Sequence, residues 1–114
     1  MEVTIYHNPN CANSRKALEI IRAKGIEPHI VEYLKKPLTP SALRHLIKDQ
    51  LKARVLDVIR TKEPVFAEME LEGRDDDCLL AAMSAHPILM NRPIVVTPKG
   101  AKLCRPGETV AELL

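Results

Sequence analysis

The sequence predicts an α/β fold with a mixed sheet, in which a β-α-β unit, a helical block and a β-β-α unit follow one another. Residues 3–6 are apolar and β-prone, residues 12–24 carry apolar side chains at helical spacing, and residues 29–34 are again β-prone. Further along, residues 94–96 form a short apolar run, and a Pro-Lys-Gly turn separates it from residues 101–105. These patterns predict one sheet covered by helices.

The composition indicates a single domain over residues 1–114. This is an ordinary length for one domain, and 46% hydrophobic residues with only 3% aromatic ones predict a core of aliphatic side chains. The net charge of +2 is too balanced to favour nucleic acid or a membrane surface as a partner. No apolar run approaches the roughly 18 residues of a membrane span, and no targeting segment is recognisable. We therefore expect a cytoplasmic protein, and a monomer because no large apolar stripe is evident.

The first helix, expected over residues 12–24, is amphipathic. Its apolar face comprises Ala17, Leu18, Ile20 and Ile21. Arg15, Lys16, Glu19 and Arg22 lie on the other face. Gly25 follows directly, and glycine is the residue that most often ends a helix.

The helical block is expected at about residues 40–85. Thr39-Pro40 is typical of a helix start, because an N-cap residue precedes a proline at the first helical position. A second helical piece is expected near residues 53–61, and residues 75–77 are three aspartates that suit another helix N-terminus. A β-α-β unit followed by β-β-α on one sheet is the layout of a thioredoxin-like domain, and the block is an insertion between its halves.

Cys11 lies directly after the first strand and loop, at the start of the first helix. The first N–H groups of a helix have no partner within it, and the helix dipole adds positive potential there. Both effects stabilise a thiolate and create an anion site, so we expect a reactive Cys11. Ser14 in the first turn and His7 at the end of the strand are candidate helpers. An ordinary buried Cys11, a capping Ser14 and a surface His7 stay open as alternatives.

The cysteine pattern excludes several other kinds of site. There are three cysteines, Cys11, Cys78 and Cys104, at wide spacing and without a CxxC motif, which indicates neither a disulfide framework nor a zinc site. No metal site is expected, and Cys78 and Cys104 are interpreted as structural. Phosphatases with a cysteine phosphate loop place an arginine six positions after the cysteine, but that position is Ala17. This phosphatase chemistry is therefore excluded.

Three arginines are candidates for binding an anion at Cys11, because a guanidinium offers a planar fork of donors to a tetrahedral oxyanion. Arg92 precedes Pro93 and the strand 94–96, where thioredoxin-like domains have a cis proline facing the active cysteine, so we predict a cis Pro93. Arg105 is expected to end the partner strand, and Arg60 to end a helix of the inserted block. The residues alone leave each arginine open as an ordinary surface residue.

Taken together, these segments resemble the glutaredoxin-coupled arsenate reductases over essentially the whole chain. The matching segments are residues 5–11, 14–15, 86–89, 91–98 and 103–106, in the family's order and spacing. The resemblance implies that Cys11 is the nucleophile and that His7 and Ser14 lower the pKa of its thiol. It further implies that Arg60, Arg92 and Arg105 bind the oxyanion. Ala12-Asn13 departs from the residues often found after the family's nucleophile.

The resemblance implies reduction of arsenate to arsenite, as in arsenical resistance. The Cys11 thiolate would attack arsenate, glutathione would add to the arsenic as co-substrate, and glutaredoxin would resolve the resulting mixed disulfide. No bound cofactor is expected. One alternative is a glutathione-linked thiol oxidoreductase acting on another substrate. A second is an Spx-type regulator that binds RNA polymerase, but Spx-type proteins usually carry a CxxC switch, and Ser14 occupies the second position of that motif.

Overall fold

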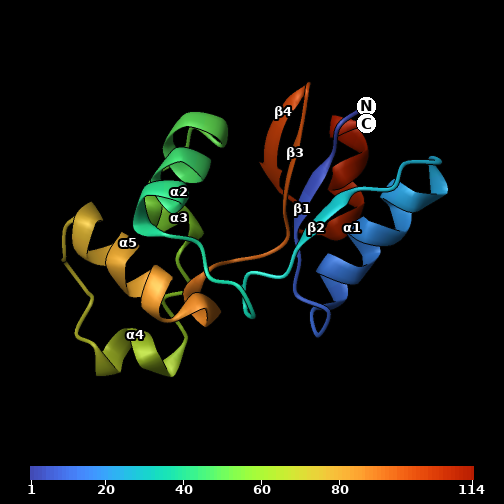
Figure 1. Cartoon of the computed structure of the whole chain (residues 1–114). Helices are drawn as coiled ribbons and strands as arrows, with labels where there is room; N and C mark the ends of the chain where they lie inside the picture. The colour runs from blue at the N-terminus through green and yellow to red at the C-terminus, as the bar shows by residue number, and fades with distance from the viewer. The chain divides into compact units, whose positions relative to one another are not determined.

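The computed structural model describes residues 1–114 as two compact units. The sheet unit comprises Met1–Lys36 and Arg92–Leu114, and the helical unit comprises Pro37–Asn91. Figure 1 shows the chain ends close together within the sheet unit. The helical unit corresponds to the insertion predicted at about residues 40–85, and the prediction that residues 1–114 form a single domain stays a prediction.

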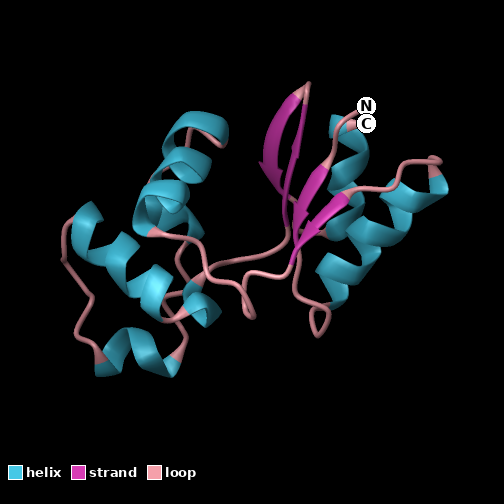
Figure 2. Ribbon diagram, in the orientation of Figure 1, coloured by secondary structure: helices cyan, strands magenta, loops and turns pink.

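The sheet unit contains a four-stranded mixed sheet with the strand order β2-β1-β3-β4. The strands are β1 (Thr4–Tyr6), β2 (His29–Val31), β3 (Ile94–Thr97) and β4 (Gly100–Leu103). β1 pairs in parallel with β2 and antiparallel with β3, and β3 pairs antiparallel with β4. The mixed sheet and the β-α-β and β-β-α order that the sequence predicts are confirmed (Figure 2).

Helix α1 (Ala12–Ala23) and the 3₁₀ helix η3 (Gly107–Leu113) lie together on one side of this sheet (Figure 1). The core between helices and sheet is aliphatic, as the composition predicts. It comprises Val3, Ile5, Ala17, Ile21, Val95, Cys104, Val110 and Leu113. α1 ends where predicted, since Gly25 takes a φ of +77°, which side chains with a Cβ atom disfavour. The last helix has 3₁₀ geometry, a detail that the sequence does not predict.

Gly107 marks the closest approach of η3 to α1. A Cβ atom there would lie 2.4 Å from the carbonyl oxygen of Asn13 and 3.0 Å from the Cβ of Lys16. It would also lie 3.1 Å from the backbone nitrogen of Ala17. Only glycine therefore allows the C-terminal segment to pack at this distance from the first turn of α1.

The helical unit consists of short helices, two of which begin at the start signals that the sequence predicts, Thr39-Pro40 and residues 75–77 (Figure 2). They are α2 (Pro40–Arg44), the π-helix η1 (His45–Gln50), α3 (Val55–Val58), α4 (Pro64–Glu68), α5 (Asp76–Ala85) and the 3₁₀ helix η2 (Pro87–Leu89). The hydroxyl of Thr39 accepts a hydrogen bond from the Ala42 N–H at 3.1 Å, and the carboxylate of Asp75 accepts one from the Cys78 N–H at 2.9 Å. No helix of the chain has both the length and the apolar character that crossing a bilayer requires.

The structure corrects one boundary that bears on a candidate site residue in the helical unit. The helix predicted for residues 53–61 ends at Val58, because Ile59 takes an extended backbone and forms a β-bridge with Met90. Arg60 therefore follows a bridge and does not end a helix. Its backbone N–H donates to the Leu89 carbonyl at 2.7 Å.

Two predicted strands are also shorter than expected. β2 ends at Val31 and not at Leu34, because the chain turns where the N–H groups of Lys35 and Lys36 both bond to the Glu32 carbonyl. β4 ends at Leu103 and not at Arg105. The Arg105 N–H bonds back to the Leu103 carbonyl at 3.1 Å and so leaves the ladder with β3.

We predict that Gly107→Ala lowers the free energy of unfolding by about 1–3 kcal/mol, as overpacking at close contacts does. The added methyl group would force η3 away from α1, and urea unfolding followed by circular dichroism would measure the loss. Glu108→Ala, at the exposed neighbouring position, is the matched control. An unfolding midpoint of Gly107→Ala equal to that of Glu108→Ala would contradict the close packing.

Candidate active site at the start of the first helix

Cys11 is the N-cap residue of α1, as its position in the sequence predicts. β1 ends at Tyr6, and Cys11 takes an extended backbone, with φ −103° and ψ 123°, just before the helix begins. Its N–H donates to the Asn8 carbonyl at 3.0 Å, and its carbonyl accepts from the Arg15 N–H at 3.0 Å. The side chain is buried. The sulfur is therefore carried by a backbone that hydrogen bonds hold in place, at the positive end of a 12-residue helix.

The register of the sheet explains why Arg92 and Arg105 lie at the same end of the sheet as Cys11. Tyr6, the last residue of β1, pairs with Ile94, the first residue of β3, and Ile94 pairs with Leu103, the last residue of β4. The segment before β3 and the segment after β4 therefore lie at the same end of the sheet as the loop that follows β1. Arg92 and Arg105 lie in those two segments.

Arg105 is in direct contact with the sulfur. Its Nη1 lies 3.8 Å from the Cys11 Sγ and donates a hydrogen bond to the Arg92 carbonyl at 2.8 Å. Arg92 is half-buried, and its Nε and Nη1 atoms are shielded from solvent. The Arg92–Pro93 bond is cis, which confirms the prediction for Pro93, and the Arg105–Pro106 bond is also cis, which was not predicted.

The pKa of the Cys11 thiol lies below its ordinary value. Burial raises the pKa. Four groups lower it by more than burial raises it: the backbone N–H of Ser14, the charge of Arg92, the Arg105 donor and the backbone N–H of Asn13. The sulfur forms no capping hydrogen bond of standard geometry with the helix, so the two N–H groups act on it mainly as dipoles. A thiolate is thus stabilised by helix dipoles and guanidinium groups.

Ser14 and His7 support the loop that leads to Cys11. The Ser14 hydroxyl lies 2.6 Å from the His7 Nδ1 and accepts from the Asn8 N–H at 3.0 Å, and all three residues are buried. Burial lowers the pKa of His7 and outweighs the opposing charge of Glu32. His7 is therefore neutral at neutral pH, and its Nδ1 shares one hydrogen bond with the Ser14 hydroxyl. Ser14 acts on the sulfur through its backbone N–H, and its hydroxyl holds the loop through His7 and Asn8.

Arg60 belongs to the helical unit, apart from the unit that carries Cys11. Its Nη1 lies 2.6 Å from the Glu63 Oε1, and both side chains are partly shielded from solvent. The geometry therefore brings Arg92 and Arg105 together with Cys11, and the role of Arg60 as a third oxyanion ligand stays a prediction.

The other cysteines have different environments, and all three cysteines are free thiols. Cys104 is fully buried in the core of the sheet unit, and burial raises the pKa of its thiol to about 11. This agrees with the structural role expected for it. Cys78 is exposed in the first turn of α5, so it adds little to a core. No group of three or more His, Cys, Asp or Glu residues could hold a metal ion.

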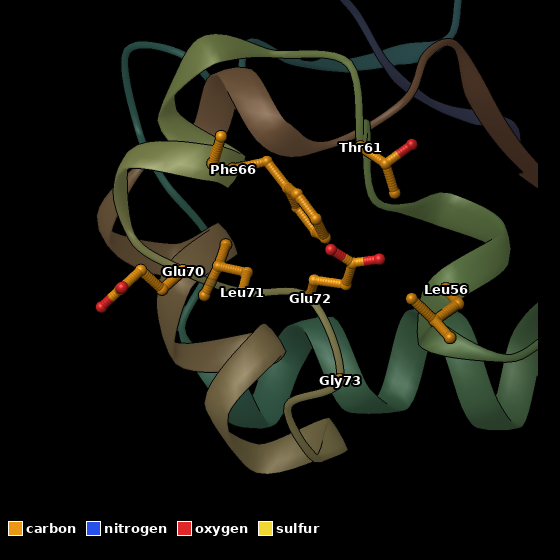
Figure 3. Close-up of a pocket in the computed structure, with 8 residues that line it drawn as sticks. Leu56, Thr61, Phe66, Glu70, Leu71, Glu72 and Gly73 are labelled. Carbon is orange, nitrogen blue, oxygen red and sulfur yellow. The ribbon is translucent and has the colours of Figure 1, made fainter.

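A cavity of about 750 Å³ lies within the helical unit, and none of the predicted site residues lines it. Leu56, Phe66 and Leu71 form its apolar part, and Glu70 and Glu72 bring carboxylates. Figure 3 shows the Phe66 ring and the Glu72 carboxylate extending toward one another. Carboxylates repel an oxyanion, so this cavity has the wrong charge for the anion chemistry expected at Cys11.

We predict that iodoacetamide alkylates Cys11 with a pH midpoint below the value of about 8.5 typical of a free cysteine. The lowered pKa means that the thiolate, which is the reacting form, is present at lower pH. Arg105→Ala should move the midpoint upward, because a positive donor is lost from the sulfur.

The alkylation is best followed in a Cys78→Ser background, since Cys78 is exposed and Cys104 is buried. Arg22→Ala is the matched control, because Arg22 lies in the last turn of the same helix and pairs with Glu27. If Arg105→Ala and Arg22→Ala gave the same midpoint, the contact between Arg105 and the sulfur would not stabilise the thiolate.

Comparison with known proteins identifies the family. The profile of the ArsC family matches residues 6–113. An arsenate reductase of Rhizobium meliloti is 50% identical over 100% of this chain and 82% of its own length, and one of Escherichia coli K12 is 47% identical over 98% and 80%. The solved structure of an arsenate reductase from Vibrio cholerae superposes with a TM-score of 0.93 at 40% identity, covering 100% of this chain and 98% of its own. The chain thus has a thioredoxin-like fold and belongs to the ArsC family.

Proposed function

We propose that this protein reduces arsenate to arsenite, with the Cys11 thiolate as nucleophile and with glutathione and glutaredoxin as the source of electrons. The observation that carries the proposal is the contact of the Arg105 Nη1 with the Cys11 Sγ at 3.8 Å, at the N-terminus of α1. This contact combines a nucleophile with a positive anion site. The relatives named arsenate reductases, at 47% and 50% identity, supply the identity of the anion.

The charge distribution suits a tetrahedral oxyanion. Arsenate carries negative charge at neutral pH, and a thiolate would repel it in the absence of positive groups. Arg92 and Arg105 offset this repulsion at the sulfur and would donate hydrogen bonds to the arsenate oxygens as the thiolate approaches. The partial charge of the helix terminus adds to them.

The proposed reaction needs two thiols besides Cys11. The Cys11 sulfur bonds to As(V) and one arsenate oxygen leaves as water, and the glutathione thiol then forms a second As–S bond with loss of another water. The glutaredoxin thiolate attacks the glutathione sulfur and breaks its bond to arsenic. The electron pair of that bond stays on arsenic, which becomes As(III), while the glutaredoxin and glutathione sulfurs are oxidised to a mixed disulfide. Hydrolysis of the remaining S–As bond releases arsenite and the Cys11 thiol.

The chain's own cysteines do not fit the resolving role. Ser14 occupies the position that a second cysteine has in a CxxC motif, and its hydroxyl is already bonded to the loop. Cys104 is buried, and its raised pKa keeps it a thiol at neutral pH. An enzyme with one reactive thiol must take the second thiol from outside, which supports glutathione and glutaredoxin as reductants.

We predict that the wild-type protein reduces arsenate in an assay with glutathione and glutaredoxin, in which added glutathione reductase couples each turnover to NADPH oxidation. Cys11→Ser should abolish this activity. Serine has no sulfur, and its hydroxyl is not ionised at neutral pH, so the first As–S bond cannot form. Cys78→Ser is the matched control and should keep wild-type turnover, because Cys78 is an exposed thiol on the other unit. Thioredoxin in place of glutaredoxin should support less turnover.

Arsenate reduction by Cys11→Ser would rule out the mechanism. A wild-type protein that reduces a glutathione mixed disulfide but not arsenate would favour the glutathione-linked oxidoreductase instead.

We predict that Arg92→Ala and Arg105→Ala each lower kcat/KM for arsenate by about 10- to 100-fold, which is the usual effect of losing a hydrogen bond to a charged group. Arg60→Ala tests the remaining predicted ligand in the same assay, and a similar loss would place Arg60 in the oxyanion site. Arg22→Ala is again the control. Unchanged kinetics in Arg92→Ala and Arg105→Ala would mean that arsenate binds elsewhere.

A further inference from the structure

The contact between Arg105 and the sulfur depends on the backbone that carries it. Arg105 is exposed, and apart from the sulfur its guanidinium is held by one hydrogen bond, which its Nη1 donates to the Arg92 carbonyl at 2.8 Å. Cys104, just before Arg105, and Gly107, two residues after it, are both buried and bonded through their backbone N–H groups. The Cys104 N–H donates to the Pro93 carbonyl at 2.8 Å, and the Gly107 N–H donates to the Asn13 side-chain oxygen at 3.2 Å.

The bond to Asn13 joins the Arg105 turn to the helix that carries Cys11. Asn13 is in the first turn of α1, two residues after Cys11, and its side chain is half-buried. The Asn13 carbonyl also contacts Gly107, where a Cβ atom would lie only 2.4 Å from it. Side chain and main chain of Asn13 therefore both meet the residue that follows the Arg105–Pro106 bond.

We propose that Asn13 is a positioning residue, whose side-chain oxygen holds the Arg105 turn against the first turn of α1 and so keeps the Arg105 guanidinium on the Cys11 sulfur. The proposal rests on the proposed function only where arsenate kinetics are used to test it. The Ala12-Asn13 pair is a departure from the residues common in the family, and this contact gives the asparagine a role of its own.

The physical reason is that a long exposed side chain samples many rotamers. Arg105 reaches the sulfur from a backbone anchored on both sides, through Cys104 and through Gly107. Removing the Asn13 amide keeps the anchor at Cys104 and the packing of Gly107 on the α1 backbone, but it removes the hydrogen bond that holds the Gly107 N–H. The guanidinium would then spend less time at the sulfur and at an incoming oxyanion.

A double-mutant cycle separates this role from a general effect on the helix. The four proteins are wild type, Asn13→Ala, Arg105→Ala and the double variant, all in the Cys78→Ser background. We expect Asn13→Ala to move the alkylation midpoint of Cys11 upward and to lower kcat/KM for arsenate by about fivefold. In the Arg105→Ala background, the same substitution should change kcat/KM for arsenate by no more than about 1.5-fold and should leave the alkylation midpoint of Cys11 in place.

Equal effects of Asn13→Ala in both backgrounds would overturn the inference, because they would show that Asn13 acts on Cys11 or on α1 without Arg105. No effect in either background would overturn it as well. Asn10→Ala is the matched control, since Asn10 is exposed beside Cys11 and bonds Asn8 through its backbone N–H. It should reproduce the wild-type values.

A further variant, Asn13→Ser, keeps an oxygen acceptor on a shorter side chain and should give values between those of wild type and Asn13→Ala. It replaces Asn13→Ala in the cycle if circular dichroism shows that Asn13→Ala is unfolded. If the wild-type protein reduces no arsenate, the proposed function fails, but the alkylation cycle still decides the role of Asn13. If arsenate is reduced and the cycle is additive, only the role of Asn13 fails.

Discussion

The structure of the site depends on the electrostatic balance at one buried sulfur. Burial alone would keep Cys11 a neutral and unreactive thiol, and burial does have this effect on Cys104, whose pKa is raised to about 11. Cys11 differs because the N–H dipoles of α1 and two guanidinium groups surround it and lower its pKa. The same atoms that stabilise the thiolate would also attract an oxyanion, so reactivity and substrate binding have one physical cause.

The sheet topology supplies these positive groups from distant parts of the chain. Because β3 runs antiparallel to β1, and β4 antiparallel to β3, the entry to β3 and the exit from β4 meet the loop that precedes Cys11. Arg92 and Arg105 are 13 residues apart and flank the hairpin. A one-residue slip in register would turn the buried side chains of these strands to the opposite face of the sheet, so the hydrophobic core fixes the pairing that brings the two arginines together.

Local signals in the sequence were sufficient for much of this arrangement. The N-caps Thr39 and Asp75, the stop at Gly25 and the cysteine at a helix start each act within one turn of chain, and the structure has all of them. The strand ends at Val31 and Leu103 are set by local turns, but the error at Arg60 comes from pairing over a long distance. The helix predicted for residues 53–61 stops early because Ile59 pairs with Met90, a partner 31 residues away that no local pattern reveals. The role of Asn13 is hidden for the same reason, because its partner Gly107 is 94 residues away.

The loop before Cys11 shows how one serine serves two purposes. The Ser14 hydroxyl bonds His7 and Asn8, and these bonds fix the backbone from which the sulfur projects. Its backbone N–H simultaneously lowers the pKa of Cys11. A cysteine at this position would supply a resolving thiol but would be a weaker hydrogen-bond partner for the loop, because sulfur is a poor acceptor. The serine thus favours a rigid, well-placed thiolate over a self-contained disulfide cycle, which agrees with the proposal that the second thiol comes from another molecule.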